Sequence, residues 1–242
     1  MLTIAVVTAA AAPGLALLSY VYLKDRHATE PIRLVARLFI MGMLIVFPTM
    51  VLQRAVVLGT GASSWWYAFF VSALMEEFLK WFVLYFAIFK HEEFDEHYDG
   101  IVYAAAVSLG FATLENILYA FVYQSSFSAL LNRAFLPVTG HALFGIAMGY
   151  YMGKAKFGRP ELRKKKLLQA LSIPILWHGV YDLVLLEARE YWMWLMFPLM
   201  GYFWTKALGK MSRANDRSPH AAAARNGSAL HEREVKISET GS

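Results

Sequence analysis

Long runs of apolar residues, rather than alternating apolar and polar positions, dominate this sequence. A helix needs roughly 20 apolar residues to cross a hydrocarbon core of about 30 Å, and runs of that length recur along the chain. Short segments with charged residues separate one run from the next. The pattern therefore predicts an all-α protein, a polytopic bundle of about seven membrane-spanning helices. The expected spans are 2–23, 34–53, 65–89, 100–123, 136–153, 167–187 and 191–208.

The composition supports a membrane protein. Hydrophobic residues make up 58% of the 242 residues and charged residues 17%, against roughly 45–50% and about 25% in soluble domains. Cysteine is absent, which excludes a disulfide framework, a cysteine nucleophile and a thiolate metal site. The first apolar run has no basic residue before it, so we expect a retained helix rather than a cleaved signal peptide. Residues 212–242 are polar and mixed in charge, which predicts a disordered tail after a transmembrane domain of residues 1–211.

Basic residues are distributed unevenly between the connections. Alternate connections together with the carboxyl end hold 19 lysines and arginines, whereas the other connections hold 3. By the positive-inside rule, the first group is cytoplasmic. We therefore predict a multi-pass protein of the cell membrane with its amino terminus outside and its carboxyl terminus in the cytoplasm. This topology explains the net charge of +5, so the expected surroundings are the lipid bilayer and no nucleic-acid partner is predicted.

Ionisable residues inside the spans carry the chemical information, because each costs about 2.5–3.5 kcal/mol to insert at the middle of a bilayer. Taken singly, they could be a neutralising ion pair, a hydrogen-bonded clip between helices or a packing histidine. Counted from the helix ends, however, all of them fall at the middle or in the outer half of the membrane, which indicates one shared site. They come from four different spans: Glu76, Glu77 and Lys80, then Glu115 and Asn116, then His141, and finally His178 and Asp182.

The charges of this set restrict the chemistry. Its four carboxylates face one lysine, Lys80, and three unbalanced negative charges are too costly in a medium of low dielectric constant. Protons, an imidazolium at His141 or His178, or a divalent metal ion must compensate them. Carboxyls that exchange protons near neutral pH are suited to general acid–base catalysis.

Four short motifs occur in order, each in its own expected span. They are Glu-Glu-x-x-Lys at 76–80, Phe-x-x-x-Glu-Asn at 111–116, a histidine at 141 with glycines at 140 and 145, and His-x-x-x-Asp at 178–182. Together they resemble the PrsW family of intramembrane proteases, which is related to the CAAX-protease and bacteriocin-processing group. The resemblance covers roughly residues 65–210.

This resemblance implies that residues 1–211 form a protease domain that cuts a single-span membrane protein. An example is the first, outer-side cut of an anti-sigma factor, which is described for some family members. The CAAX-type relatives carry histidine where this chain has Glu115, and often asparagine where it has Asp182. Their prenylated substrates are therefore not implied here.

Direct attack by water is the mechanism that we expect. One of Glu76 and Glu77, with Glu77 favoured, accepts a proton from a water molecule that His141 or His178 also holds. Glu115 shares a proton with this pair or protonates the leaving group. These five residues are the expected catalytic set.

Three further residues are expected to support it. Asp182 orients the imidazole of His178 one helical turn away, as carboxylates commonly do. Lys80 balances a neighbouring carboxylate, and Asn116 donates a hydrogen bond to the developing oxyanion. Ser72 lies one turn before Glu76 and is interpreted as a small packing residue.

Two alternatives remain open at this point. No cofactor is required by the expected mechanism, but His141, His178 and a glutamate could bind zinc, although the sequence lacks an HExxH motif. Carboxylate and histidine clusters also mark proton pathways, so a proton-coupled transporter is the rival from another class. Against transport, the sequence shows no inverted repeat, and a non-catalytic binding protein with the same cluster is a third possibility.

Overall fold

The computed structural model describes residues 2–26, 29–60, 63–122 and 127–218. Within these ranges the chain is helical and contains no strand, as the apolar pattern predicts. The elements are α1 (Leu2–Leu23), α2 (Ile32–Leu44), α3 (Val46–Thr60), α4 (Ser64–Trp66), η1 (Tyr67–Ala73), α5 (Leu74–Ala87), α6 (Asp99–Val122), α7 (Phe127–Arg133), η2 (Ala134–Val138), α8 (Thr139–Phe157), η3 (Pro160–Leu162), α9 (Arg163–Glu187), η4 (Arg189–Tyr191) and α10 (Trp192–Asn215).

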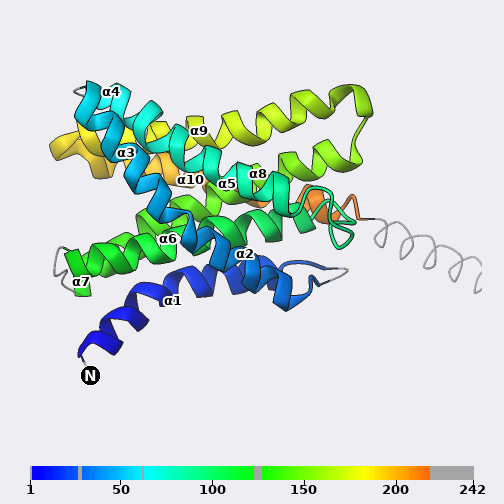
Figure 1. Ribbon diagram of the computed structural model, residues 1–242, viewed down its shortest axis with the longest axis horizontal. Coiled ribbons are helices and arrows are strands. Elements are labelled where there is room, and N and C mark those ends of the chain that lie inside the picture. Colours follow the sequence, from blue (N-terminus) through cyan, green and yellow to red (C-terminus); the bar gives the residue numbers. More distant parts are fainter. Residues whose placement is uncertain (1, 27–28, 61–62, 123–126, 219–242) are drawn as a thin grey trace, which may run out of the picture.

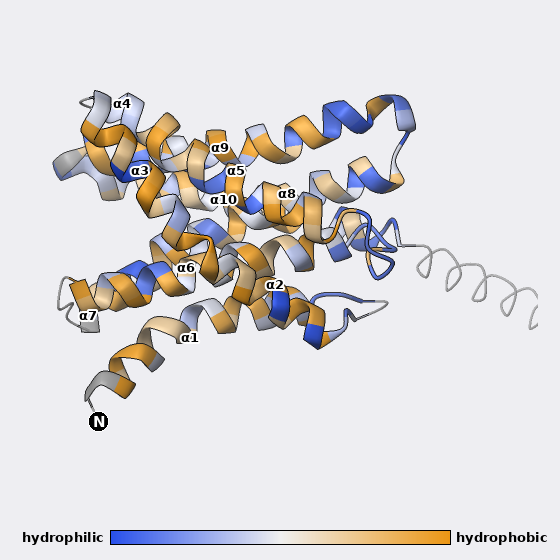
Figure 2. Ribbon diagram, viewed as in Figure 1, coloured by the Kyte–Doolittle hydropathy of each residue, from blue (hydrophilic) through white to orange (hydrophobic). Residues whose placement is uncertain are grey.

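Several of these elements join end to end, so the described residues form seven helical rods, the predicted number. The joined rods are α2 with α3, α4 and η1 with α5, α7 and η2 with α8, η3 with α9, and η4 with α10 (Figure 1). Four helical stretches within the described residues are long and apolar enough to cross a membrane: Ile4–Leu23, Ile32–Thr60, Asp99–Val122 and Pro160–Glu187. Hydrophobic residues run along the rods, and hydrophilic residues gather near one end of the bundle (Figure 2). The expected all-α membrane architecture is confirmed.

Helix α6 lies in the middle of the bundle and packs against α1, α2 and α8. Every residue from Asp99 to Thr113 is buried, and many of them are small, which lets neighbouring helices approach closely. A Cβ atom on Gly149 of α8 would lie 2.0 Å from the carbonyl oxygen of Gly100 in α6, so only glycine fits there. This close contact fixes α8, which carries His141, beside α6, which carries Glu115.

The connections of the bundle separate into two ends, as alternating spans require (Figure 1). Residues 24–26, 29–31, 88–98 and 158–162 and the carboxyl end of α10 lie at one end, which we call the basic end. The start of α1, the end of α3, the start of α4, the end of α6, the start of α7 and the α9–α10 connection lie at the opposite end. The assignment of the basic end to the cytoplasm stays a prediction.

Helix α10 continues to Asn215, beyond the domain boundary expected at residue 211. The Asn215 side chain accepts a hydrogen bond from the backbone of Arg26 and donates one to the carbonyl of Lys24, each over 3.2 Å. The start of the expected tail is therefore attached to the bundle. The rest of it, residues 219–242, lies outside the described residues.

Candidate active site

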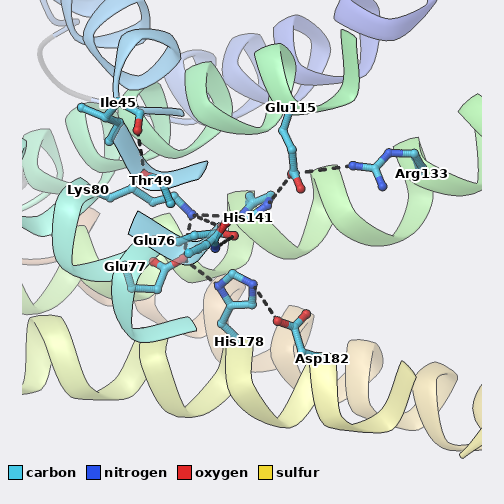
Figure 3. Close-up of polar contacts among 11 residues, drawn as sticks. Ile45, Thr49, Glu76, Glu77, Lys80, Glu115, Arg133, His141, His178 and Asp182 are labelled. Atoms are coloured by element: carbon cyan, nitrogen blue, oxygen red, sulfur yellow. Dashed lines mark hydrogen bonds and ion pairs between the residues drawn. The ribbon is translucent and has the colours of Figure 1, made fainter. Parts of the chain in front are cut away.

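Lys80 lies at the centre of the polar residues that the sequence singled out (Figure 3). It shares α5 with Glu76 and Glu77, and all three side chains are buried. Its Nζ atom is 2.7 Å from Glu77 Oε1, 3.5 Å from Glu76 Oε2 and 3.0 Å from His141 Nδ1 of α8. Lys80 therefore joins the first motif to the third as well as balancing its own carboxylates.

The contacts of His141 determine its tautomer. The ammonium of Lys80 can only donate, so Nδ1 of His141 accepts and the proton lies on Nε2. Nε2 then donates to Glu115 Oε2 over 3.2 Å. Phe111 completes this part of the site, because Lys80 Nζ lies 4.2 Å from its ring centre and the His141 ring meets it edge-on at 5.6 Å. This cation–π contact gives the phenylalanine of the second motif a physical role.

His178 lies between two carboxylates. Its Nδ1 is 3.0 Å from Glu77 Oε1 on α5, and its Nε2 is 3.4 Å from Asp182 Oδ2 on its own helix, α9. Because both ring nitrogens face acceptors, the imidazole is suited to carry two protons. The approach of α9 depends on Gly179, where a Cβ atom would lie 2.3 Å from the ring of Phe69 in η1.

Arg133 belongs to the site, although the sequence did not indicate it. Its Nη2 lies 3.6 Å from Glu115 Oε2, and its Nε donates to Asn116 Oδ1 over 2.8 Å. In the sequence it is a single basic residue in a connection and contributes only to the topology count. The amide nitrogen of Asn116 donates to the carbonyl of Ala10 over 2.8 Å, so both polar groups of this buried side chain are engaged. Asn116 thus forms a clip behind Arg133 and lines neither of the cavities described below, and its expected role as an oxyanion donor stays a prediction.

Each of three site helices is distorted one turn before its functional residue. The π-helical η1 ends three residues before Glu76, and the π-helical η2, which contains Pro137, ends three residues before His141. Pro174 lies four residues before His178. Wide turns and prolines interrupt the regular hydrogen bonding of a helix, and they are frequent next to functional residues. They change the direction in which the following turn presents its side chains.

Two adjoining cavities lie beside these residues. The inner cavity, of about 140 Å³, has room for several water molecules at roughly 30 Å³ each. The outer one, of about 250 Å³, extends to Gln53, Tyr67 and Leu186 near the end opposite the basic end. The two cavities share Ser72, Glu76, Glu115, Asp182 and Leu185. Glu77 lines neither cavity. The inner cavity is lined by Ser72, Glu76, Glu115, Arg133, Pro137, His141, Phe144, His178, Tyr181, Asp182 and Leu185.

Gln53 is a second residue that sequence reasoning missed. It lies on α3 and donates from Nε2 to Glu76 Oε1 over 3.2 Å. A polar residue at the end of an apolar run is its signal in the sequence, but such a signal does not name a partner. Gln53 and Lys80 hold the Glu76 carboxylate from its two sides at the cavity wall.

Four side chains of the site are close enough together to hold a metal ion. Glu76, Glu77, His141 and His178 each offer one ligand atom, and these atoms lie within 4.8 Å of one another. Glu77 Oε2 is buried and makes no hydrogen bond within the described residues. Two carboxylates and two imidazoles are ligands that suit zinc. The residues therefore fit a divalent cation. Such an ion would replace the Lys80 ammonium as the partner of Glu76, Glu77 and His141.

Comparison with protein families matches residues 30–204 to a family described as PrsW family intramembrane metalloprotease. The chain belongs to the PrsW family. The four-motif resemblance is thereby confirmed, and the chain is an intramembrane protease.

Individual relatives are similar in sequence to this chain over nearly their whole length. Protease PrsW of Bacillus subtilis (strain 168) is 46% identical over 211 residues, which are 87% of this chain and 95% of the relative. Protease PrsW of Geobacillus kaustophilus is 49% identical over 86% of this chain and 91% of the relative. Protease PrsW of Oceanobacillus iheyensis is 48% identical over 89% of this chain and 98% of the relative. No solved structure matches the chain.

Proposed function

We propose that this PrsW-family protease hydrolyses a peptide bond of a single-span membrane protein, such as an anti-sigma factor, with water that Glu76 activates. The observation that carries the choice of base is the position of the two glutamates. Glu76 lines both cavities, whereas Glu77 lines neither and is enclosed by Lys80 and His178. Glu76 therefore replaces Glu77, which the sequence favoured, as the general base.

The proposed reaction needs three steps at these side chains. A water molecule in the inner cavity attacks the carbonyl carbon, and its proton passes to Glu76. The positive charge of His178, whose two N–H groups are held by Glu77 and Asp182, stabilises the negative charge that develops on the carbonyl oxygen, in the place first expected for Asn116. The carbon–nitrogen bond then breaks, and the proton held by Glu76 passes to the leaving nitrogen.

The charges of the site support these roles of Glu76 and His178. Four carboxylates, including that of Glu115, face Lys80, Arg133 and a doubly protonated His178. One negative charge remains, so a single extra proton neutralises the set. That proton is the one that Glu76 accepts from the attacking water. Glu77 and Asp182 orient His178, and Lys80 orients His141.

The family description and the fitting donor set favour a test of metal dependence. A divalent cation would be held by Glu76, Glu77, His141 and His178, and it would supply Lewis-acid activation of water or of the carbonyl. The test compares 1,10-phenanthroline with its non-chelating 1,7 isomer, together with elemental analysis of the purified protein. Equal activity in the two reagents and no bound metal favour the metal-free mechanism.

Access to the site supports a cut on the outer side of the membrane. The outer cavity reaches Tyr67 and Leu186, near the end of the bundle opposite the basic end. If positive-inside orientation holds, that end faces outward, so water reaches Glu76 from outside. Membership of a protease family favours hydrolysis over the proton-coupled transport that the same cluster first allowed.

The deciding experiment is a cleavage assay with the purified full-length protein in detergent or liposomes. A peptide that contains one membrane-spanning segment is added, and the fragments are identified by mass spectrometry. The proposal requires fragments with the natural protein and cleavage at least about 10²-fold slower with Glu76→Gln. Cleavage at a normal rate by a correctly folded Glu76→Gln protein would refute the choice of base.

A further inference from the structure

Tyr181 is a buried residue of the inner cavity that the proposed mechanism does not use. It lies on α9 three residues after His178, so the two side chains share a face of the helix. Tyr181 is 4% exposed, and its hydroxyl makes no hydrogen bond within the described residues. Buried polar groups without a partner are rare in folded proteins, because their desolvation is not compensated. A molecule that enters the cavity can supply the partner, since Tyr181 forms part of its wall.

The neighbours of the Tyr181 ring place its hydroxyl beside the two histidines of the site. The ring meets the Phe144 ring edge-on with centres 6.1 Å apart, and Phe144 stacks on the His178 ring at 5.0 Å. Tyr181 Cε2, which is bonded to the carbon that bears the hydroxyl, lies 3.8 Å from the position of a Cβ atom on Gly140. Gly140 directly precedes His141 in α8. The hydroxyl end of the ring therefore lies against α8 next to His141.

The other side-chain donors that line the inner cavity already have partners. The two histidines use their ring N–H groups on carboxylates of the site. Arg133 is bound to two residues of α6, and the Ser72 hydroxyl is hydrogen-bonded to Asp182. Among the described residues of this cavity wall, Tyr181 is the one with a donor that has no partner.

We infer that the Tyr181 hydroxyl donates a hydrogen bond to the oxyanion that forms when water attacks the substrate carbonyl. The inference rests on the proposed function and adds a residue to it. A fixed donor in a site sheltered from water stabilises the developing negative charge more than it stabilises the uncharged substrate. The positive charge of His178 acts on the same oxygen, whereas Tyr181 supplies a directed hydrogen bond. The O–H bond of Tyr181 stays intact, and a neutral phenol adds no charge to the site.

The test compares Tyr181→Phe with the natural full-length protein in the cleavage assay and in thermal unfolding. The variant keeps the ring and its contact with Phe144 and loses the hydroxyl alone. We expect kcat to fall by about 10²–10³-fold, the usual effect of removing one oxyanion donor, with KM nearly unchanged. The melting temperature should stay the same or rise, because the variant removes a buried hydroxyl that has no partner within the described residues.

Tyr98→Phe is the matched control. Tyr98 is a buried tyrosine at the basic end, and its hydroxyl donates to the carbonyl of Val21 over 3.0 Å. Removing this hydroxyl should lower the melting temperature and leave kcat unchanged, which is the opposite of the result expected for Tyr181→Phe. Equal losses of kcat in the two variants would overturn the inference, because kcat would then not depend on which hydroxyl is removed.

A second measurement uses a peptide with a phosphinate group in place of the bond that the natural protein cuts. Because the phosphinate resembles the tetrahedral intermediate, Tyr181→Phe should weaken its binding by about the same factor as it lowers kcat/KM. Natural cleavage and normal phosphinate binding in Tyr181→Phe overturn the inference, even where Glu76→Gln is inactive and the proposed base stands. Slow cleavage by Tyr181→Phe beside normal cleavage by Glu76→Gln supports the inference and refutes the choice of base instead.

Discussion

His178 Nδ1 lies 3.0 Å from Glu77 Oε1, although 101 residues separate them in the sequence. The contact joins α9 to α5 at the wall of the inner cavity, where Glu76 is the neighbouring carboxylate. Adjacent glutamates on one helix therefore have different surroundings. Glu77 is enclosed and holds other side chains, whereas Glu76 faces the space where water and substrate can enter.

The first prediction compares the two glutamates. Glu76→Gln should reduce the rate of cleavage by about 10²–10⁴-fold, the usual contribution of a general base, and should leave the melting temperature near its normal value. Glu77→Gln should reduce both activity and stability, because it weakens the contacts with Lys80 and His178. Cleavage rates and thermal unfolding in detergent check this, with Glu92→Gln as the control. Normal activity in Glu76→Gln with loss in Glu77→Gln would reverse the assignment.

The second prediction concerns Lys80. Its side chain is fully buried and pairs with Glu77, and removing one partner of a buried ion pair typically costs about 3–5 kcal/mol. Lys80→Met should therefore destabilise the protein strongly. Adding Glu77→Gln to Lys80→Met removes the uncompensated charge and should restore part of the stability without restoring activity. A double mutant as unstable as Lys80→Met would show that the pair is not the source of the loss.

The third prediction concerns Arg133. Hydrogen bonds to charged groups contribute about 1.5–3 kcal/mol, so loss of its contacts with Glu115 and Asn116 should lower the cleavage rate by roughly 10–100-fold at about 1.4 kcal/mol per tenfold. Arg133→Met should show this loss. Arg133→Lys should recover part of it, because lysine keeps the charge but not the forked geometry. The melting temperature should also fall, because the buried Asn116 loses the hydrogen bond that Arg133 donates to its Oδ1, which typically costs about 1–3 kcal/mol. Unchanged cleavage in Arg133→Met would remove Arg133 from the site.

The sequence predicts the helices and most of the polar site because the properties involved are local. The length of an apolar run determines whether a helix can span the membrane. An ionisable residue inside such a run, such as Glu77 or His178, is costly to insert and therefore indicates a functional site. The contact of Gln53 with Glu76 is different, because it depends on how α3 packs against α5. Consecutive residues on a helix point about 100° apart, so the rotation of α5 decides which glutamate faces the cavity. Arg133 was counted only as a basic residue of a connection for the same reason.

The end of α10 is another feature that the sequence alone does not predict, in this case at a domain boundary. Polar composition after residue 211 predicts disorder, yet Asn215 binds the backbone of Lys24 and Arg26 across the fold. Hydrogen bonds of this kind have no signature in a single sequence. They form only when segments that are distant in the sequence meet in the folded protein.

The fourth prediction concerns topology and follows from the 19-to-3 distribution of basic residues between alternate connections. Reporter fusions after residue 60 and after residue 128 should report an outside location. Fusions within 158–166 and at the carboxyl end should report the cytoplasm. Residues 60 and 128 lie at one end of the bundle, and residues 158–166 and the end of α10 lie at the other. A cytoplasmic signal after residue 128 would invert the protein and place the outer cavity toward the cytoplasm.

The last prediction is the position of the cut in the substrate. Glu115 lies seven residues before the end of α6, or about 10 Å from it at 1.5 Å per residue, and the outer cavity continues toward that same end of the bundle. A substrate must expose its backbone at this level, but a continuous helix keeps its carbonyl groups in internal hydrogen bonds. Scission is therefore easiest where the substrate helix frays or is broken by glycine or proline. We expect the cut within about two helical turns, roughly 7 residues, of the outer end of the substrate span. Sequencing the new termini of a released substrate measures this directly, and moving a Gly-Pro pair along the span should move the cut with it. New termini near the cytoplasmic end of the span would mean that the site receives its substrate from the basic end, contrary to the position of the outer cavity.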